Sequence, residues 1–437
     1  MKAVARHADP AASVAAKVHR RVLPWLIAGW FIAYLDRFNV SFAALQMNED
    51  LALSSTVFGF GAGVFFLGYA IFEIPSNVIL ARVGARVWLA RIMVTWGVIS
   101  IAMTATQGAW SFYGLRFLLG VAEAGCFPGM AFYLTRWLSP RDRAAALASL
   151  ATMAMVSGIA GAPLAAALLS LDEVWGLAGW QWLFLVEGVP AVVIGWCIYT
   201  FLPDGPDDAA WLTDAERAWL KSHTRGDDRH VPSRTALSAV TGDRRYWMWG
   251  MAFFCVTAAG SALRLFQPTI LREVTGLGDV LSALLTAVPS LAGLVAIVYV
   301  GRRSTRHDER RWHAAMPMLI AAVGFAFMGV TYGVAGALLV ASVATLGVAS
   351  QPPLFASVSS ASTGATNAVG IAFVNSIAAV GAFLGPYLMG YALDRTGSLA
   401  MVCAAAGAMI ALGGVITLQT RERRESSVTL AQPAATA

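Results

Sequence analysis

The chain has 437 residues, of which 58% are hydrophobic and 13% charged, and its formal net charge is +6. Soluble domains carry about 25% charged residues, so this composition argues against a soluble enzyme and indicates a protein surrounded by lipid. The basic residues lie between apolar segments, which also argues against a nucleic-acid-binding protein.

A helix that crosses a bilayer needs roughly 20 predominantly apolar residues. Reading along the chain for this length predicts twelve spans, at 22–46, 56–80, 87–106, 109–137, 143–170, 180–202, 246–270, 280–301, 313–333, 335–358, 366–391 and 398–419. The segment before the first span is polar and basic, so no cleavable signal peptide is expected. The four cysteines lie singly in spans without a CxxC pair, so we expect neither disulfide nor metal site, and no cofactor.

Basic residues cluster before the first span and after the second, fourth, eighth and twelfth spans. The loops at the opposite ends, such as "QMNEDLALSS" and "SLDEVWGLAG", are acidic, and Arg272 and Arg395 are the main exceptions. Because positive residues mark cytoplasmic loops, this distribution predicts that both termini are cytoplasmic.

The longest hydrophilic interval divides the chain into two halves. The predicted parts are an N-terminal segment (1–21), a six-helix half (22–202), a cytoplasmic linker (203–245), a second six-helix half (246–420) and a tail (421–437). In the linker, Thr213 and Glu216 have the spacing of a capping box and predict the start of a short amphipathic helix.

The second half repeats features of the first half. Arg82, Arg86 and Trp88 recur 224 positions later as Arg306, Arg310 and Trp312, and Pro163 recurs 223 positions later as Pro386. Parallel six-helix repeats are the architecture of the major facilitator fold, whose substrate site lies near the midplane between the halves. We therefore expect an all-α membrane protein of this fold.

Few ionisable residues lie inside the spans: Asp36, Arg37, Glu73, Arg116, Glu123, Glu187 and Arg264. Each costs roughly 2.5–3.5 kcal/mol at a helix centre, so each should face a cavity or a partner. Arg116 and Glu123 share one helical face. If the first and fourth helices face one cavity, these two residues join Asp36 and Arg37 in a single patch of two acids and two cations. Such a patch suits a proton-coupled anion carrier, because guanidinium groups bind carboxylates and buried carboxyls can exchange protons.

The alternative interpretation is that these charges form two permanent salt bridges that hold the helices together. For Glu73, near the cytoplasmic end of its span, and Glu187, in an outer-lying helix, we favour a structural role. Tyr34 and Tyr69 fit packing and hydrogen bonding to an acidic ligand equally well.

Several motifs resemble the anion:cation symporter family of the major facilitator superfamily, which includes phthalate, tartrate, hexuronate and galactonate permeases. They are "YLDRFNVSFAAL", "GYAIFEIPSNVILARVGARVWLARIM", "RFLLGVAEAGCFPG", "WQWLFLVEGVPAVVIG", "WLTDAERAWL" and "GIAFVNSIAAVGAFLGPYLMG". The resemblance covers nearly the whole chain and is specific for the family, although less so for the substrate.

This resemblance implies roles for individual residues. Asp36 and Glu123 match the proton-linked acids of the family. Arg37 and Arg116 match arginines that control those acids or hold the anion. Residues that match substrate contacts are Tyr34, Tyr69 and Asn375. Structural or gating roles are expected for Glu73, Arg82, Arg86, Arg306 and Arg310.

Two positions depart from the family pattern. Ala81 replaces the aspartate of the loop motif, which weakens the expected gating bridge. In "GSALRLFQP", Ser261 replaces an aromatic residue and Arg264 adds a cation. We expect Arg264 and Gln267 to bind substrate; the alternative for Arg264 is that it extends to water at the outer surface.

The predicted function is import of a small organic carboxylate anion with protons by alternating access, by a monomer in the bacterial inner membrane. The carried acid stays open between an aromatic acid, a sugar acid and a hydroxy-dicarboxylate. One alternative is an anion exchanger or an exporter of an amphipathic compound, and another is a receptor or scaffold that does not transport. An enzyme is not expected, because the chain has no convincing nucleophile–base arrangement, phosphate loop or metal cluster.

Overall fold

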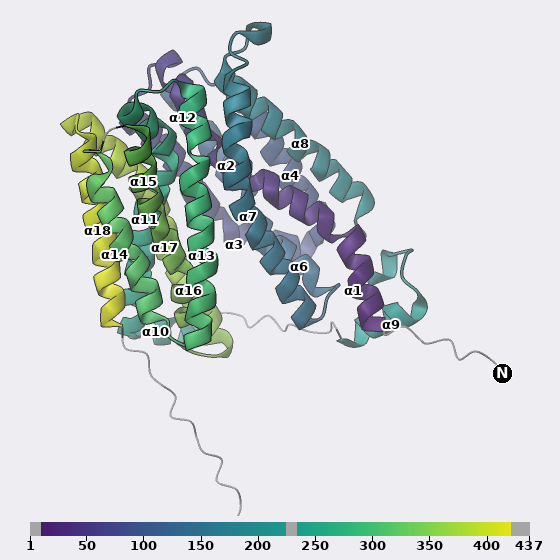
Figure 1. Cartoon of the computed structure of the whole chain (residues 1–437). Coiled ribbons are helices and arrows are strands. Elements are labelled where there is room, and N and C mark those ends of the chain that lie inside the picture. Colours follow the sequence, from purple (N-terminus) through teal and green to yellow (C-terminus); the bar gives the residue numbers. More distant parts are fainter. Residues whose placement is uncertain (1–9, 224–233, 332, 421–437) are drawn as a thin grey trace, which may run out of the picture.

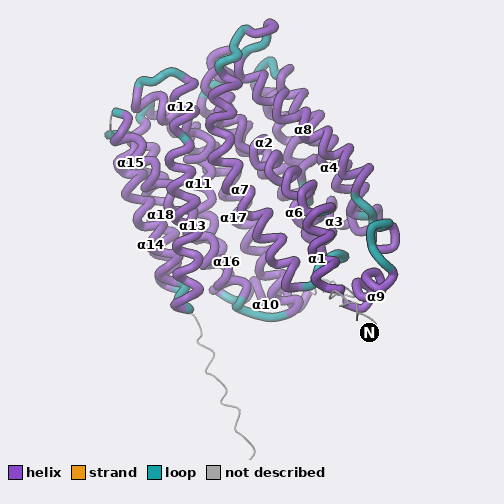
Figure 2. Tube along the Cα trace, turned by 45° about the vertical axis from the view of Figure 1, so that its right-hand side comes forward, coloured by secondary structure: helices purple, strands orange, loops and turns teal. Residues whose placement is uncertain are grey.

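The structure, a computed structural model, describes residues 10–223, 234–331 and 333–420. Its regular elements in these ranges are helices (Figure 2). The first half contains α2 (Leu23–Asp50), α3 (Ser55–Val83), α4 (Ala85–Ala102), α5 (Ala109–Glu123), α6 (Cys126–Thr135), α7 (Pro140–Leu169) and α8 (Gly179–Phe201). The second half contains α11 (Arg244–Thr275), α12 (Asp279–Leu285), α13 (Ala287–His307), α14 (Arg311–Met328), α15 (Val334–Thr345), α16 (Gln351–Ser359), α17 (Gly364–Thr396) and α18 (Leu399–Gln419). Short 3-10 helices are η1 (Met103–Ala105), η2 (Val174–Gly176), η3 (Pro206–Asp208) and η4 (Leu346–Ser350).

Three further helices, α1 (Pro10–Arg21), α9 (Asp214–His223) and α10 (Arg234–Gly242), gather at one end of the bundle (Figure 1). We call this the linker end, and the end with the α2–α3 and α11–α12 turns the distal end. The predicted tail and the linker residues 224–233 lie outside the described residues. Of the N-terminal segment, the described part forms α1, which sequence reasoning did not anticipate.

The predicted all-α membrane architecture is confirmed. Within the described ranges, eleven helical stretches are long and apolar enough to cross a bilayer. The remaining predicted span is α2, whose 28 residues are less apolar because they include Asp36, Arg37, Glu49 and Asp50. The predicted fourth, eighth and tenth spans are each divided into two helices, as α5–α6, α12–α13 and α15–α16.

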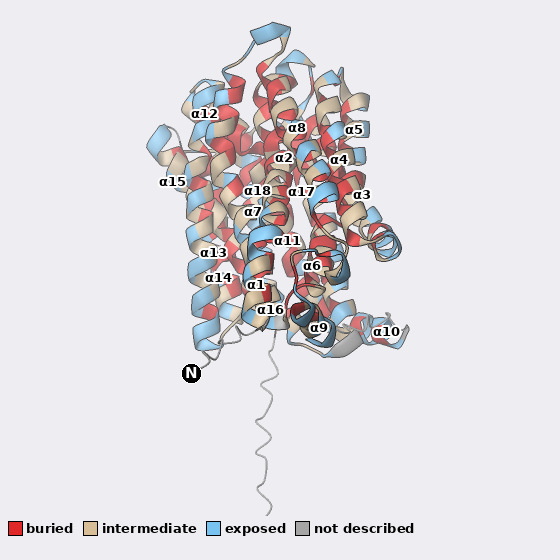
Figure 3. Cartoon of the chain, turned by 90° about the vertical axis from the view of Figure 1, so that its right-hand side faces the viewer, coloured by how far each residue is buried: buried red, intermediate tan, exposed pale blue. Residues whose placement is uncertain are grey.

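The outer surface of the bundle is apolar, as lipid requires. Ile74, Val295 and Leu339 expose 74%, 61% and 66% of their surface. Buried residues fill the interior between the helices (Figure 3). A protein surrounded by water rarely exposes so many large aliphatic side chains, so this distribution indicates that lipid surrounds the bundle.

A break in the fourth span separates α5 from α6 directly after Glu123. Gly125 has a left-handed backbone with φ of 83°. The neighbouring carbonyl of Ala124 accepts a hydrogen bond from Ser76 Oγ at 2.6 Å, and Ser76 Oγ in turn accepts from Trp88 Nε1 at 2.9 Å. The break therefore leaves Glu123 at the buried C-terminal end of a half-helix, a feature common at transporter binding sites.

Gly125→Ala is expected to destabilise the protein strongly, because an added Cβ would lie 2.6 Å from Ser76 Oγ. The left-handed backbone costs about 1–2 kcal/mol for an L-residue, and the overpacking adds about 1–3 kcal/mol. The measurement is the unfolding temperature of the detergent-purified protein. Gly276→Ala is the matched control, because Gly276 has φ of 68° and open space around it. Equal unfolding temperatures for the two variants would show that the Ser76 contact is unimportant.

The linker binds each half separately. The predicted capping box is present, since Glu216 N donates to Thr213 Oγ at 3.3 Å and Thr213 N donates to Glu216 Oε2 at 2.8 Å. Glu216 also accepts from Lys17 Nζ at 2.7 Å and Ser13 Oγ at 2.6 Å, which attaches α1 to α9. On the other side, α10 packs against α11 and α17.

Glu216→Gln is expected to loosen α1 by about 1.5–3 kcal/mol, the range for a hydrogen bond to a charged group. The hydrogen bonds from Lys17, Ser13 and Thr213 lower the pKa of Glu216 from 4.5 to about 2. A lowered pKa stabilises the docked form fully above the ordinary value, and this stabilisation is lost as the pH falls from about 4.5 to about 2. Faster tryptic cleavage after Lys17 in the variant at neutral pH would report the loosening. Asp214→Asn, on an exposed face of α9, should leave the cleavage rate unchanged.

Contacts between the halves close the distal end. Arg272 Nη2 of α11 is paired with Glu49 of α2 at 2.8 Å, and Arg272 Nη1 donates to the Leu45 carbonyl oxygen at 2.8 Å. Asp394 at the end of α17 accepts from the backbone N–H groups of Ser55 and Thr56, at 3.1 and 2.7 Å. These bonds join the end of α2 and the start of α3 in the first half to the ends of α11 and α17 in the second half.

Candidate functional site

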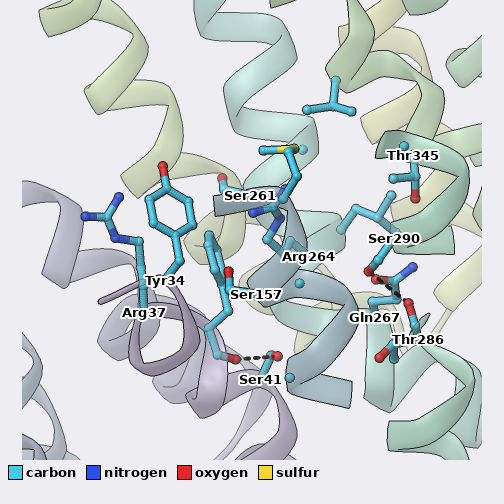
Figure 4. Close-up of a pocket in the computed structure, with 18 of the residues that line it drawn as sticks. Tyr34, Arg37, Ser41, Ser157, Ser261, Arg264, Gln267, Thr286, Ser290 and Thr345 are labelled. Carbon is cyan, nitrogen blue, oxygen red and sulfur yellow. Dashed lines mark hydrogen bonds between the residues drawn. The ribbon is translucent and has the colours of Figure 1, made fainter. Parts of the chain in front are cut away.

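A cavity of about 340 Å³ lies between the two halves, toward the middle of the bundle. Residues of α2, α3, α7 and α8 line it from the first half, and residues of α11, of α13 to α18 and of η4 line it from the second half. The charged residues that line it are Arg37, Glu187 and Arg264. Figure 4 shows Tyr34 and Arg37 together on one side, and Gln267 with Thr286, Ser290 and Thr345 on the other.

Arg37 of α2 faces this cavity and forms an ion pair with Glu123, the last residue of α5. The rings of Tyr34, Tyr69 and Phe65 surround the guanidinium, with centroids 4.8, 5.2 and 5.5 Å from its Cζ atom. Glu123 is fully buried, and its Oε2 has no hydrogen-bond partner in the described structure. Aromatic faces favour a cation, so the site holds Arg37 charged while leaving part of its fork to the cavity.

Asp36 points away from this pair, toward α4. It is fully buried and accepts hydrogen bonds from Trp96 Nε1 at 2.6 Å, from Asn39 Nδ2 at 3.1 Å and from Ser100 Oγ. Asp36 does not line the cavity. Neighbouring residues of a helix diverge by about 100°, so of these two residues only Arg37 forms an ion pair with the acid of α5. The charges of Asp36, Arg37, Arg116 and Glu123 nevertheless interact with one another, as a single patch of two acids and two cations requires, and of the four only Arg37 borders the cavity.

Arg116 is fully buried and does not line the cavity. Its Nη2 donates to the Ala62 carbonyl oxygen at 3.4 Å, and its Cζ lies 5.0 Å from the Phe65 ring centroid. Its Nε and Nη1 atoms have no hydrogen-bond partner in the described part of the chain. Arg116 thus packs on Phe65 away from the cavity wall, and its charge interacts with those of Asp36 and Glu123 without a direct ion pair in the described structure.

Arg264 and Gln267 of α11 line the cavity from the second half. The Arg264 Cζ lies 4.4 Å from the ring centroid of Phe38 on α2. Gln267 is 7% exposed, and its Nε2 has no hydrogen-bond partner among the described residues. Arg264 is therefore at the interface of the halves and does not extend to the outer surface.

The remaining predicted site residues are scattered. Tyr34 lines the cavity, whereas Tyr69 lies outside the cavity wall and contacts the Arg37 guanidinium and the Phe65 ring. Asn375 of α17 is exposed and lies outside the cavity wall. Glu73 forms no ion pair within the described ranges, and its charge interacts with that of Arg37.

The predicted gating arginines lie at the linker end of their helices. Arg86 pairs with Asp204 at 2.9 Å, and Arg310 Nη1 donates to the Ala356 carbonyl oxygen at 3.0 Å. Arg82 and Arg306 lie in the last turns of α3 and α13. Arg86 therefore contacts the linker, and Arg310 makes its contact within the second half.

Sequence reasoning missed three partners of the buried acids, namely Asn39, Trp96 and Ser100. Asn39 follows Asp36 by three positions, which is one helical turn and could have been recognised. Trp96 and Ser100 come from α4, so only the packing of α4 on α2 reveals them. Glu187, assigned a structural role on an outer helix, instead reaches the cavity wall.

Comparison with known proteins identifies the family. The family model described as Major Facilitator Superfamily matches residues 26–386. The chain belongs to this superfamily. An Agrobacterium vitis protein provisionally named as a tartrate transporter is 40% identical over 94% of this chain and 95% of its own length. A quinolone resistance transporter of Acinetobacter baumannii is 34% identical over 87% of this chain and 88% of its own.

Solved structures of the superfamily share the fold. A bacterial homologue of the human lysosomal transporter Spinster, in an inward-facing and unoccupied conformation, superposes with a TM-score of 0.74 at 16% identity, covering 93% of this chain and 94% of that one. The relatives are consistent with the anion:cation symporter resemblance. As a superfamily member with transporter relatives, the chain is a multi-pass secondary transporter and not an enzyme.

Proposed function

We propose that this transporter imports a small organic dicarboxylate, such as tartrate, together with protons across the bacterial inner membrane. The observation that carries the proposal is the placement of Arg37 and Arg264, one from each half, on the wall of one cavity. The two guanidinium groups carry like charges that repel each other across the cavity. An anion with a carboxylate at each end relieves this repulsion and joins the two halves.

The proposed proton coupling depends on Arg37, for which Glu123 and the substrate carboxylate are alternative partners. Its guanidinium is paired with Glu123 in this structure. A proton on Glu123 removes the negative charge of that partner, so the Arg37 fork becomes available to the substrate carboxylate. Binding of a proton and of the anion then favour each other. The name of the 40% identical relative supports tartrate as the first compound to test.

Export of an amphipathic compound is the second candidate, because a 34% identical relative is named a quinolone resistance transporter. The cavity wall also offers apolar contacts, including Phe38, Phe42, Phe66 and Phe325. Two cavity arginines disfavour a cationic drug, but a quinolone carries a carboxylate. The two candidates therefore differ in direction and in the size of the apolar part of the substrate.

We infer that the linker end is cytoplasmic and that this conformation faces the cytoplasm. The arginine-rich loops lie at the linker end. The distal end is closed by the Arg272–Glu49 pair and by the Asp394 contacts. Labelling of a cysteine introduced at Ser222 by an impermeant reagent outside intact cells would contradict this orientation.

The test uses purified protein in proteoliposomes with an inward proton gradient. We expect uptake of radiolabelled L-tartrate above its equilibrium level, which a protonophore abolishes. Norfloxacin, a quinolone, serves as the competing probe for the exporter alternative. Accumulation of norfloxacin without uptake of L-tartrate would overturn the dicarboxylate proposal, and tartrate exchange without net accumulation would overturn proton coupling.

A further inference from the structure

Three hydroxyl side chains of the second half form one part of the cavity wall. Thr286 joins α12 to α13, Ser290 lies in the first turn of α13, and Thr345 is the last residue of α15. The two helices approach closely at Gly293, one turn after Ser290, where an added Cβ would lie 2.9 Å from Thr345 Cγ2. The three side chains lie on the side of the cavity that also holds Gln267 (Figure 4). We call Thr286, Ser290 and Thr345 the hydroxyl wall.

The hydrogen of each hydroxyl in this wall is already donated to a backbone carbonyl of the protein. Thr286 Oγ1 donates to the Ala283 oxygen at 2.7 Å, and Thr345 Oγ1 donates to the Ala341 oxygen at 2.8 Å. Ser290 Oγ donates to the Thr286 carbonyl oxygen at 2.9 Å. A hydroxyl has one hydrogen and two lone pairs. Since no described residue donates to these three side-chain oxygens, the hydroxyl wall offers a ligand acceptors and not donors.

The opposite need exists at Gln267 of α11. This side chain is 7% exposed and lines the cavity, and its Nε2 is buried without an acceptor among the described residues. An unpartnered buried donor is unfavourable, so a ligand that supplies an acceptor here gains affinity. Gln267 follows Arg264 by three positions and therefore lies on the same face of the helix, one turn away. A carboxylate bound to Arg264 thus has its neighbouring carbon close to Gln267 and the hydroxyl wall.

A hydroxyl group on the substrate satisfies both needs with one oxygen atom. Its hydrogen can be donated to the hydroxyl wall, and its lone pairs can accept from Gln267 Nε2. A carboxylate offers acceptors alone, and a methylene or an aromatic carbon offers neither. Sites that hydrogen-bond a substrate hydroxyl discriminate against analogues without it, because the polar groups of the site are then left unpaired.

We propose that Gln267 and the hydroxyl wall determine specificity by binding hydroxyl groups next to the carboxylate that Arg264 holds. The inference rests on the proposed carboxylate transport and deepens it, because it makes the substrate a hydroxylated organic acid and not a plain dicarboxylate or an aromatic acid. The cavity is bounded here by both halves, since an added Cβ on Gly158 of α7 would lie 4.0 Å from Ser290 Oγ. The hydroxyl groups of the substrate therefore bind where the halves meet.

The test compares acids that differ in hydroxyl groups alone. The full-length protein is purified in detergent, and the shift of its unfolding temperature is measured with L-tartrate, L-malate and succinate, which carry two, one and no hydroxyl groups. We expect affinity to fall in this order, by about 2- to 12-fold for each hydroxyl lost, the range for a neutral hydrogen bond.

Variants then assign this preference to the hydroxyl wall. Ser290→Ala and Thr286→Val are each expected to lower the affinity for L-tartrate by about 2- to 12-fold and to leave that for succinate unchanged. Thr286→Ser keeps the hydroxyl and should keep the preference. Thr305→Val is the matched control, because Thr305 lies on α13 and donates to the Gly301 carbonyl oxygen at 3.0 Å but is exposed outside the cavity wall.

A second pair of probes separates this proposal from the dicarboxylate proposal. D-gluconate and hexanoate each carry one carboxylate, and only D-gluconate carries hydroxyl groups. Binding of D-gluconate without any of the three dicarboxylates overturns the dicarboxylate proposal, and its loss in Ser290→Ala still supports the hydroxyl wall. The hydroxyl wall is overturned if the hydroxyl-free acid of each pair binds as tightly as its partner, or if no probe binds. It is also overturned if Ser290→Ala and Thr286→Val weaken L-tartrate and succinate equally or leave both unchanged.

Discussion

Arg264→Ala is expected to lower the affinity for L-tartrate by about 10- to 150-fold, the equivalent of about 1.5–3 kcal/mol for a hydrogen bond to a charged group. The arginine lines the cavity and stacks on Phe38, with no carboxylate paired to it in the described structure. Its charge is therefore available to a ligand. Removing it leaves one end of a dicarboxylate without a cation.

The Arg264→Lys variant tests the planar shape of the guanidinium group separately from its positive charge. Lysine keeps the positive charge but not the planar fork, so an intermediate loss of affinity is expected if the fork binds a carboxylate. Binding is measured by the shift of the unfolding temperature with L-tartrate concentration. Arg245→Ala is the matched control, because Arg245 lies on the same helix but is paired with Asp243 near its start. An Arg264→Ala variant with unchanged affinity would show that this arginine only supports packing on Phe38.

Glu123→Gln is expected to abolish proton-driven accumulation while tartrate counterflow continues. Glutamine resembles the protonated acid, so Arg37 loses its ionic partner and stays available to the anion. A membrane potential of 100 mV supplies about 2.3 kcal/mol for each charge, or about 50-fold in concentration, and this gain should disappear with the coupled proton. Uptake with and without a protonophore measures it in proteoliposomes.

The Asp36→Asn variant is compared with Glu123→Gln, because Asp36 is an acid in a different place. Asp36 lies outside the cavity wall, and its three donors come from Asn39, Trp96 and Ser100. Its neutral variant is also expected to lose accumulation, as the family resemblance implies. Glu309→Gln, at the linker end and paired with His313, is the control for both. If both neutral variants accumulate tartrate as the unmodified protein does, neither acid couples protons.

Much of the fold could be predicted from the sequence, because in lipid each segment must satisfy its backbone hydrogen bonds locally. A backbone in hydrocarbon must satisfy its own hydrogen bonds, so each long apolar run becomes a helix whatever its neighbours are. The short linker helix after Thr213 is equally local, since the capping box bonds residues three positions apart. At Gly125 the apolar run continues, but the helix is broken beside contacts with Ser76 that come from another helix.

The partners of the charged residues in the candidate site depend on helix packing. Which charged residues enter the membrane can be read from the sequence alone, and Arg37, Glu123 and Arg264 therefore needed a cavity or a partner. That Arg37 meets Glu123, that Arg264 faces the cavity and that Asp36 turns toward α4 follows from the three-dimensional arrangement of the helices. Helical periodicity defines the faces of a helix, but the packing of the other helices decides which face meets the cavity and which meets protein.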